Sequence, residues 1–169
     1  MAEFDVSKNE DLGGWFNVAI YATNEISFCP DFLTNLNAHS IVYGESDEIL
    51  DFLPVGENIS ISEPIRKGKN GATYSITASF DFSMQSEEID SFLHKYLNKD
   101  VMLIGIQWSD RKKVYGSKRF PLAFSYELIN GKNLEDGNRI RVTVSGDIPQ
   151  KPVYIIEPTD DEIVVEPES

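Results

Sequence analysis

The strongest structural constraint in the sequence is a ten-residue stretch in which polar and apolar side chains alternate. Residues 73–82 read Thr-Tyr-Ser-Ile-Thr-Ala-Ser-Phe-Asp-Phe. Successive side chains of a β-strand point to opposite faces, so this alternation is typical of a strand with one buried face and one face in water. The stretch therefore predicts a half-buried strand whose inward side chains are Tyr74, Ile76, Ala78, Phe80 and Phe82.

Other segments show related patterns. The alternation recurs over residues 139–145, over 58–62 and over 119–128. Residues 101–108 are apolar at consecutive positions, as expected of a central strand that is covered on each side, and residues 15–22 are a further strand candidate. In the strand predicted over 119–128, the inward side chains are Phe120, Leu122, Phe124, Tyr126 and Leu128.

One segment has the periodicity of a helix instead. Between residues 86 and 98, apolar side chains recur at intervals of three and four, which places them on a single stripe of an α-helix. Ser86 is suited to be the N-cap, acidic residues follow it, and Lys95 and Lys99 stand at the other end, as the helix dipole favours. We therefore expect a helix over about 86–98, packed on the sheet through Ile89, Phe92, Leu93, Tyr96 and Leu97.

Turn signals between these segments indicate the fold class. Lys69-Asn70-Gly71 predicts a tight hairpin, Ser109–Ser117 predicts a second hairpin between the strands at 101 and 119, and residues 130–138 form a longer loop. Together the elements predict a mainly β domain over residues 1–156, either a β-sandwich or a partly closed antiparallel barrel with one packed helix. Residues 157–169 are acidic and are predicted to be a flexible C-terminal tail.

The charge of the chain is strongly segregated. The 169 residues carry 15 Lys and Arg against 28 Asp and Glu, a formal net charge of −13. Residues 1–63 and 157–169 are acidic, whereas residues 64–156 have more bases than acids. Such polarity suits head-to-tail contact with copies of the same chain or with a charged neighbour. The predicted subunit-contact residues lie in two basic groups, in which Tyr115 is expected to be an exposed aromatic: Arg66, Lys67, Lys69, Arg111, Lys112, Lys113, Tyr115, Lys118 and Arg119.

Several classes of function are disfavoured by composition. An acidic chain is a poor binder of nucleic acid, because phosphate neutralisation supplies most of that affinity, so we expect DNA contact to be passive at most. The single Cys29 can form neither an intramolecular disulfide nor a thiolate-rich zinc site. The longest apolar runs fall short of a membrane span, and residues 1–7 lack the pattern of a signal peptide. We therefore expect no membrane partner and a cytoplasmic site of synthesis.

No catalytic arrangement stands out either. His94 falls on the flank of the predicted helix, away from its apolar stripe, and His39 has no second imidazole nearby in the sequence. A general base needs a positioned partner, and a metal site needs further ligands. Residues 44–47 lack the second glycine of a nucleophile elbow. We predict that the chain is not an enzyme and has no catalytic, cofactor or metal site.

The stretch from Val101 to Tyr154, about a third of the chain, has a characteristic pattern of strand and turn residues. It consists of an apolar strand, a basic turn, a second strand, a loop and a last strand with a proline-containing exit. The residues that carry the pattern are Gly116-Ser117, Pro121-Leu122, Phe124, Tyr126, Gly131, Asp136, Asn138, Ser145-Gly146, Pro149 and Pro152-Val153-Tyr154. In these residues the stretch resembles small proteins encoded in the structural-gene clusters of phages and prophages of Bacteroidetes hosts, including the crAss-like phages.

The resemblance implies a virion structural protein of the tail, or of the neck between head and tail, that forms a ring. Tail-tube and tail-completion proteins are similar in outline to the fold expected here, a β-sandwich or barrel flanked by a helix. The implied partners are copies of the chain in a ring and neighbouring tail or neck proteins, in a virion assembled in the host cytoplasm. The alternative is a soluble carbohydrate- or peptide-binding β-sandwich, which would display an exposed aromatic groove.

Overall fold

The computed structural model describes residues 14–44, 50–52, 59–82, 87–135 and 137–157. The predicted N-cap Ser86, the side chain of Phe82 and the predicted tail beyond Glu157 lie outside the described residues.

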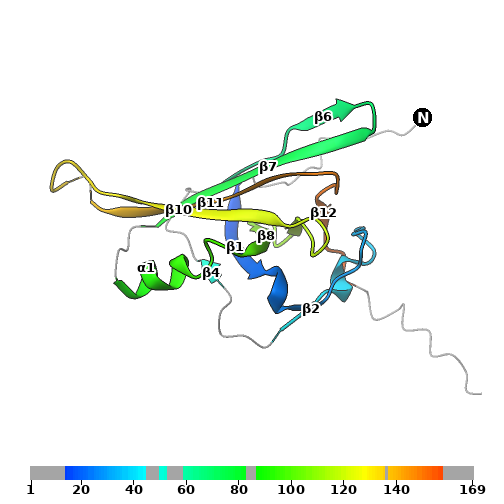
Figure 1. Cartoon of the computed structure of the whole chain (residues 1–169), viewed down its shortest axis with the longest axis horizontal. Coiled ribbons are helices and arrows are strands. Elements are labelled where there is room, and N and C mark those ends of the chain that lie inside the picture. Colours follow the sequence, from blue (N-terminus) through cyan, green and yellow to red (C-terminus); the bar gives the residue numbers. More distant parts are fainter. Residues whose placement is uncertain (1–13, 45–49, 53–58, 83–86, 136, 158–169) are drawn as a thin grey trace, which may run out of the picture.

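Within the described residues, ten strands form one curled antiparallel sheet (Figure 1). A separate two-stranded sheet joins β2 (Ile26–Phe28) to β3 (Val42–Tyr43), and the α-helix is α1 (Glu87–His94). The mainly β, antiparallel fold with one helix that the sequence predicts is thereby confirmed. The strands of the large sheet are β1 (Trp15–Ala22), β4 (Leu50–Phe52), β5 (Ile59–Ser62), β6 (Ile65–Gly68), β7 (Gly71–Phe82), β8 (Asp100–Gln107), β9 (Lys112–Tyr115), β10 (Leu122–Ile129), β11 (Arg139–Ile148) and β12 (Val153–Tyr154).

The sheet has two limbs that meet at β8. In the first limb the order is β4-β1-β8-β9-β12, and in the second it is β10-β11-β7, with β5 and β6 both on the outer edge of β7. The limbs join where Leu122 and Ala123 of β10 pair with Val101 and Asp100, at the start of β8. The main hydrophobic core lies between the limbs and takes side chains from β1, β7, β8, β9, β10 and β11, together with Leu93 and Tyr96.

Strand β8 separates two cores, which explains its unbroken apolar sequence. Val101 and Leu103 belong to the main core. Met102 and Ile104 point to the opposite face and pack in a second core against residues of the 23–44 segment. We call residues 23–44, which include β2 and β3, the lobe. The prediction of a central strand covered on each side is confirmed.

The alternating strands are placed largely as predicted. In β7 the buried positions are Ile76, Ala78 and Phe80, and in β11 they are Ile140, Val142, Val144 and Ile148. The inward placement of Leu128 was wrong, because this side chain is 45% exposed. Figure 1 shows β10 and β11 running out beyond the first limb, and Leu128 lies near the end of β10.

The first predicted hairpin is confirmed and the second is wrong. Lys69 and Asn70 form a two-residue loop between β6 and β7, and Gly71 takes up the positive φ of 117° that follows it. By contrast, residues 112–115 are not a loop but strand β9, and β8 forms its hairpin with β9. The run of bases at 111–113 led to the prediction of an exposed loop. In the structure Val114 lies in the second core and Tyr115 in the main core, so both faces of β9 are covered.

The helix is shorter than predicted. It ends at His94, after which the N–H groups of Tyr96 and Leu97 bond to the carbonyl oxygens three residues back. These tighter turns have the geometry of a 3₁₀-helix, in which side chains three residues apart are aligned, and they place Tyr96 in the main core beside Leu93. A continued α-helix would not align these two side chains in this way. The acidic first turn of α1 is confirmed.

Candidate interaction surfaces

The basic group at 111–119 is largely bound to the chain itself. The ammonium group of Lys113 lies 2.5 Å from Glu63 Oε1, and its side chain is only 12% exposed. Tyr115 is 1% exposed and packs edge-on against Trp15, so the prediction of an exposed aromatic contact at Tyr115 was wrong. The reason is the position of β9 between β8 and β12. Burial and the nearby Glu63 carboxylate raise the pKa of the Tyr115 hydroxyl far above its usual value.

Three of the exposed members of this group, Arg111, Lys118 and Arg119, also have partners within the chain. The Arg111 guanidinium lies 4.0 Å from the centre of the Tyr154 ring, and that of Arg119 lies 4.7 Å from the centre of the Phe32 ring. The Lys118 ammonium donates a hydrogen bond to the Ile26 carbonyl oxygen at 2.9 Å. These contacts hold β12 and the lobe against β9 and the segment that follows it, so this group is structural as well as basic.

The other basic group stands apart. We call residues 65–74 the arm: they comprise β6, its two-residue turn and the start of β7, and they extend beyond the rest of the sheet in Figure 1. All of β6 is exposed, including Ile65 at 62%. Within the part of the chain that the structure describes, the side chains of Arg66, Lys67 and Lys69 form no ion pair, hydrogen bond or ring contact.

The lobe has the opposite character. Between Thr23 and Gly44 it carries Glu25 and Asp31 but no Lys or Arg. Its surface exposes several large apolar side chains, and Phe28 and Val42 face each other across the β2–β3 pair. The exposed apolar residues of the lobe are Phe28, Phe32, Leu36 and Val42, and Ile156 adds another next to Glu157. Sequence reasoning missed this surface because its residues fall outside the strands that the alternating pattern predicts.

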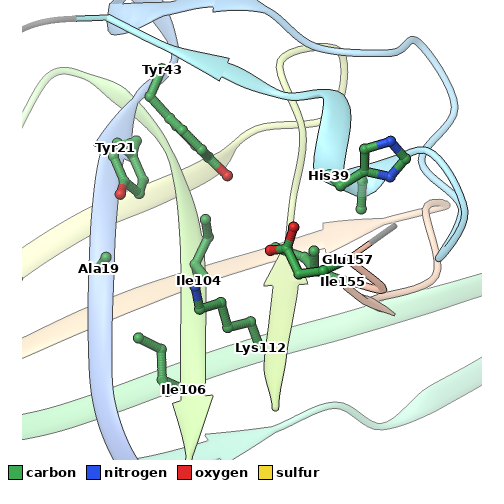
Figure 2. A pocket seen from close by; sticks show the side chains of 10 residues that line it. Ala19, Tyr21, His39, Tyr43, Ile104, Ile106, Lys112, Ile155 and Glu157 are labelled. Carbon is green, nitrogen blue, oxygen red and sulfur yellow. The ribbon is translucent and has the colours of Figure 1, made fainter. Parts of the chain in front are cut away.

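A pocket of about 170 Å³ opens between the first limb and the lobe (Figure 2). The rings of Tyr21 and Tyr43 stack with their centres 4.4 Å apart. Burial, followed by the neighbouring Tyr21, raises the pKa of the Tyr43 hydroxyl well above its usual value, so this group stays a neutral hydrogen-bond donor. The pocket is lined by Ala19, Tyr21, Ala38, His39, Tyr43, Ile104, Ile106, Lys112, Ile155 and Glu157.

The size and lining of this pocket suit one apolar side chain or ring. An apolar cavity of similar volume, about 150 Å³, holds a single benzene molecule in another protein. Aliphatic side chains of β8 form the floor, while Lys112 and Glu157 bring opposite charges to the rim (Figure 2). No sequence pattern indicates this pocket, because its lining comes from β1, β8, β9, the lobe and residues near the end of the described chain.

The candidate catalytic residues have no arrangement of partners in the described chain. His39 lines the same pocket as Glu157, but the imidazole is exposed and no ion pair joins the two within the described residues. His94 is exposed at the end of α1. Cys29 is half-buried beside the second core, where its thiol donates to the Pro30 carbonyl oxygen. Among the described residues no three His, Cys, Asp or Glu side chains are grouped to hold a metal ion.

An exposed aromatic pair lies where β1 begins and β8 ends. The rings of Phe16 and Trp108 meet edge to face with their centres 4.9 Å apart, and both remain substantially exposed. Trp108 follows β8, in the turn that leads to β9, and not inside the predicted strand.

Comparisons with known proteins give no relative. No family model matches the chain, and neither a curated protein nor a solved structure matches it significantly. In the described part of the chain, the helix is too short and too polar to cross a membrane.

Proposed function

We propose that this protein is a non-enzymatic structural subunit of a phage virion, which assembles with copies of itself into a ring or tube of the tail or of the head-tail neck. The resemblance over Val101–Tyr154 supports this assignment, and so does the curled antiparallel sheet with one helix. The finer likeness to tail-tube and tail-completion proteins is part of the proposal. It rests on general architecture alone, and many functions share one architecture.

The observation that carries the proposal is the arm. Three cations without a partner among the described residues project from a chain whose net charge is −13. Exposed acidic side chains of a second copy, such as Asp31, Glu87 and Glu88, are of opposite sign to the arm. A contact between two different surfaces of the same chain is heterologous, and such contacts generate rings when the rotation between copies closes.

Native mass spectrometry and negative-stain microscopy of the purified full chain test the proposal. We expect ring-shaped oligomers. The double variant Arg66→Glu with Lys67→Glu should shift the population towards folded monomers, because it reverses the charge of the arm. The matched control is Lys95→Glu with Lys132→Glu, which makes the same change in net charge at exposed positions outside the arm.

The control should assemble like the parent chain, and circular dichroism should show that both variants are folded. A strict monomer at high concentration, with absence of the chain from purified virions, would contradict the proposal. If the two double variants weaken assembly equally, the effect comes from the change in net charge and not from a contact made by the arm.

A second candidate function is binding of a carbohydrate or a peptide, which the Phe16–Trp108 pair favours. Exposed aromatic rings stack on sugar rings and on apolar peptide side chains. Titration with a panel of oligosaccharides and peptides should then change tryptophan fluorescence, and Trp108→Ala should abolish that change. An unchanged spectrum across the panel would remove this candidate.

A further inference from the structure

The pocket between the first limb and the lobe has an aliphatic floor on the face of β8 opposite the main core. Ala19 of β1 pairs with Ile104 of β8. Ile106, the next residue of β8 on the same face, pairs with Lys112 of β9. The second core covers this face of the first limb elsewhere, so the floor of the pocket is apolar and open on one side.

Two opposite charges stand at the rim of this pocket. The Ile155 N–H donates to the Lys112 carbonyl oxygen at 2.9 Å, and the chain then carries Glu157 to the same pocket. In Figure 2 the Lys112 side chain extends from β9 across β8, and the Glu157 carboxylate faces the same space. Within the described residues neither side chain forms an ion pair or a hydrogen bond. Both charges are therefore available to a ligand that carries both signs.

The Tyr43 hydroxyl adds a neutral donor. It points into the same space in Figure 2 and forms no hydrogen bond among the residues that the structure describes. Its ring stacks on that of Tyr21, which limits its rotation. Burial raises the pKa of this hydroxyl, so at neutral pH it can donate to a carboxylate without adding a charge.

We propose that the pocket binds a free α-amino acid with an apolar side chain, such as leucine. The side chain enters over β8, the carboxylate contacts Lys112 and the Tyr43 hydroxyl, and the ammonium contacts Glu157. A volume of about 170 Å³ suits such a side chain, since about 150 Å³ is enough for benzene in another protein.

The rim charges argue for an amino acid over a neutral ring of the same size. An α-amino acid carries both of its charges on the carbon that bears its side chain, so it can bind both sides of the rim at once. A neutral ring would displace water from the two charges and replace none of the lost hydrogen bonds. All of the lining comes from one copy of the chain, so this inference goes beyond the proposed assembly and does not depend on it.

Isothermal titration calorimetry of the purified full chain with L-leucine tests the proposal. We expect saturable binding of leucine and little binding of glycine, which lacks the apolar side chain. Leucinamide lacks the carboxylate and isocaproate lacks the ammonium. Each should bind about fivefold more weakly than leucine, or by about 1 kcal/mol, the upper value for an exposed ion pair. Leucinamide also stands in for the N-terminal residue of a peptide, so its weaker binding distinguishes a free amino acid from a peptide end.

Charge-removing variants link each part of the ligand to its residue. Lys112→Met and Glu157→Gln should each weaken leucine binding by about fivefold. Lys112→Met should not weaken leucinamide binding further, and Glu157→Gln should not weaken isocaproate binding further, because the lost partner is already absent. Lys132→Met and Glu135→Gln make the same changes of charge at exposed positions outside the pocket. These controls should bind leucine like the parent chain, and circular dichroism should show that all four variants are folded.

Two kinds of result would overturn the proposal. If leucine binds no more tightly than glycine, the pocket is not a site for an apolar amino acid. If leucinamide and isocaproate bind as tightly as leucine, or if Lys112→Met and Glu157→Gln leave its affinity unchanged, the rim does not recognise the two charges of the ligand.

Discussion

Gly105 lies in the middle of β8, directly beneath the indole ring of Trp15. A Cβ atom at this position would stand 2.6 Å from Trp15 Cζ3 and 3.3 Å from Ile61 Cδ1. The absence of a side chain therefore lets Trp15 from β1 and Ile61 from β5 approach the strand. Since β5 lies on the outer edge of the second limb and β1 lies in the first, this close approach is one place where the curled sheet folds back on itself.

Gly105→Ala should destabilise the fold by about 1 to 3 kcal/mol, the usual range for overpacking a filled core. The measurement is the free energy of unfolding in urea, followed by circular dichroism. Gly68→Ala is the control, since the added Cβ would have only ordinary contact with the Gly71 carbonyl oxygen, 3.6 Å away. A Gly105→Ala variant as stable as this control would mean that the Trp15 ring moves aside without loss.

Leu93 and Phe92 are neighbours in α1 but differ in burial. Leu93 is 0% exposed within the main core, whereas Phe92 is only partly buried and packs on its margin. Leu93→Ala should therefore cost about 2 to 5 kcal/mol of stability, and Phe92→Ala should cost less in spite of its larger side chain. Urea unfolding of the two variants side by side gives the comparison. The reverse order would mean that Phe92 anchors the helix.

At the scale of elements, β7 and β11 are held together by an ion pair as well as by the sheet. Asp81 and Arg141 are direct partners in the pair, with Arg141 Nε donating to Asp81 Oδ1 at 2.8 Å and Nη2 donating to Oδ2 at 3.1 Å. The hydrogen bonds from Arg141 hold the pKa of the Asp81 carboxyl below its ordinary value of 3.8. Because the folded state favours the ionised form, this pair stabilises the fold above that pH and ceases to do so as the pH falls through the lowered pKa.

Asp81→Asn should therefore lower the free energy of unfolding at pH 7 by about 1 kcal/mol, a value kept small because Arg141 is 38% exposed. The difference from the parent chain should shrink as the pH falls below the ordinary value for aspartate. Urea unfolding at a series of pH values between neutral and strongly acid measures it. Asp100→Asn, at an exposed position, is the control. A difference that does not depend on pH would show that the carboxylate charge is not responsible.

The base of the arm is also fixed by a specific contact. Strands β5 and β6 pair with β7 in one continuous register, interrupted at residues 63–64. Glu63 at this interruption binds Lys113 of β9. Lys113, one of the predicted subunit-contact residues, thus anchors the arm to the first limb. The cations of the arm itself remain available for contact with another copy.

At the scale of the whole molecule, charge is separated between surfaces. The Debye length is about 10 Å at 0.1 M salt and about 3 Å at 1 M. If the arm cations hold copies together, assembly should weaken when sodium chloride is raised from 0.1 M to 1 M, and the Arg66→Glu, Lys67→Glu variant should show much less of this dependence. Sedimentation velocity at the two salt concentrations makes the measurement. If assembly strengthens with salt, the copies are held together by apolar contact and the charges on them repel each other.

Local pattern was sufficient for much of the fold. Alternation determined the strand character and the facing of β7 and β11, and Asn70-Gly71 determined the turn of the arm, because these depend on backbone conformation and on neighbouring residues. Apolar runs on both faces likewise indicated that β8 is central. The exposed, basic character of the arm also followed from the sequence, since nothing apolar in Arg66-Lys67-Gly68-Lys69 requires cover.

Only the tertiary structure decided which charged and aromatic groups are free. Lys113 and Tyr115 have the local sequence pattern of exposed loop residues. The placement of β9 between β8 and β12 nevertheless buries Tyr115 and pairs Lys113 with Glu63. The same holds for the Tyr21–Tyr43 pocket and the apolar surface of the lobe, whose residues come from separate segments. Burial depends on which residues pack against a side chain in space. Those neighbours lie at irregular distances along the chain, so no periodic pattern in the sequence indicates them.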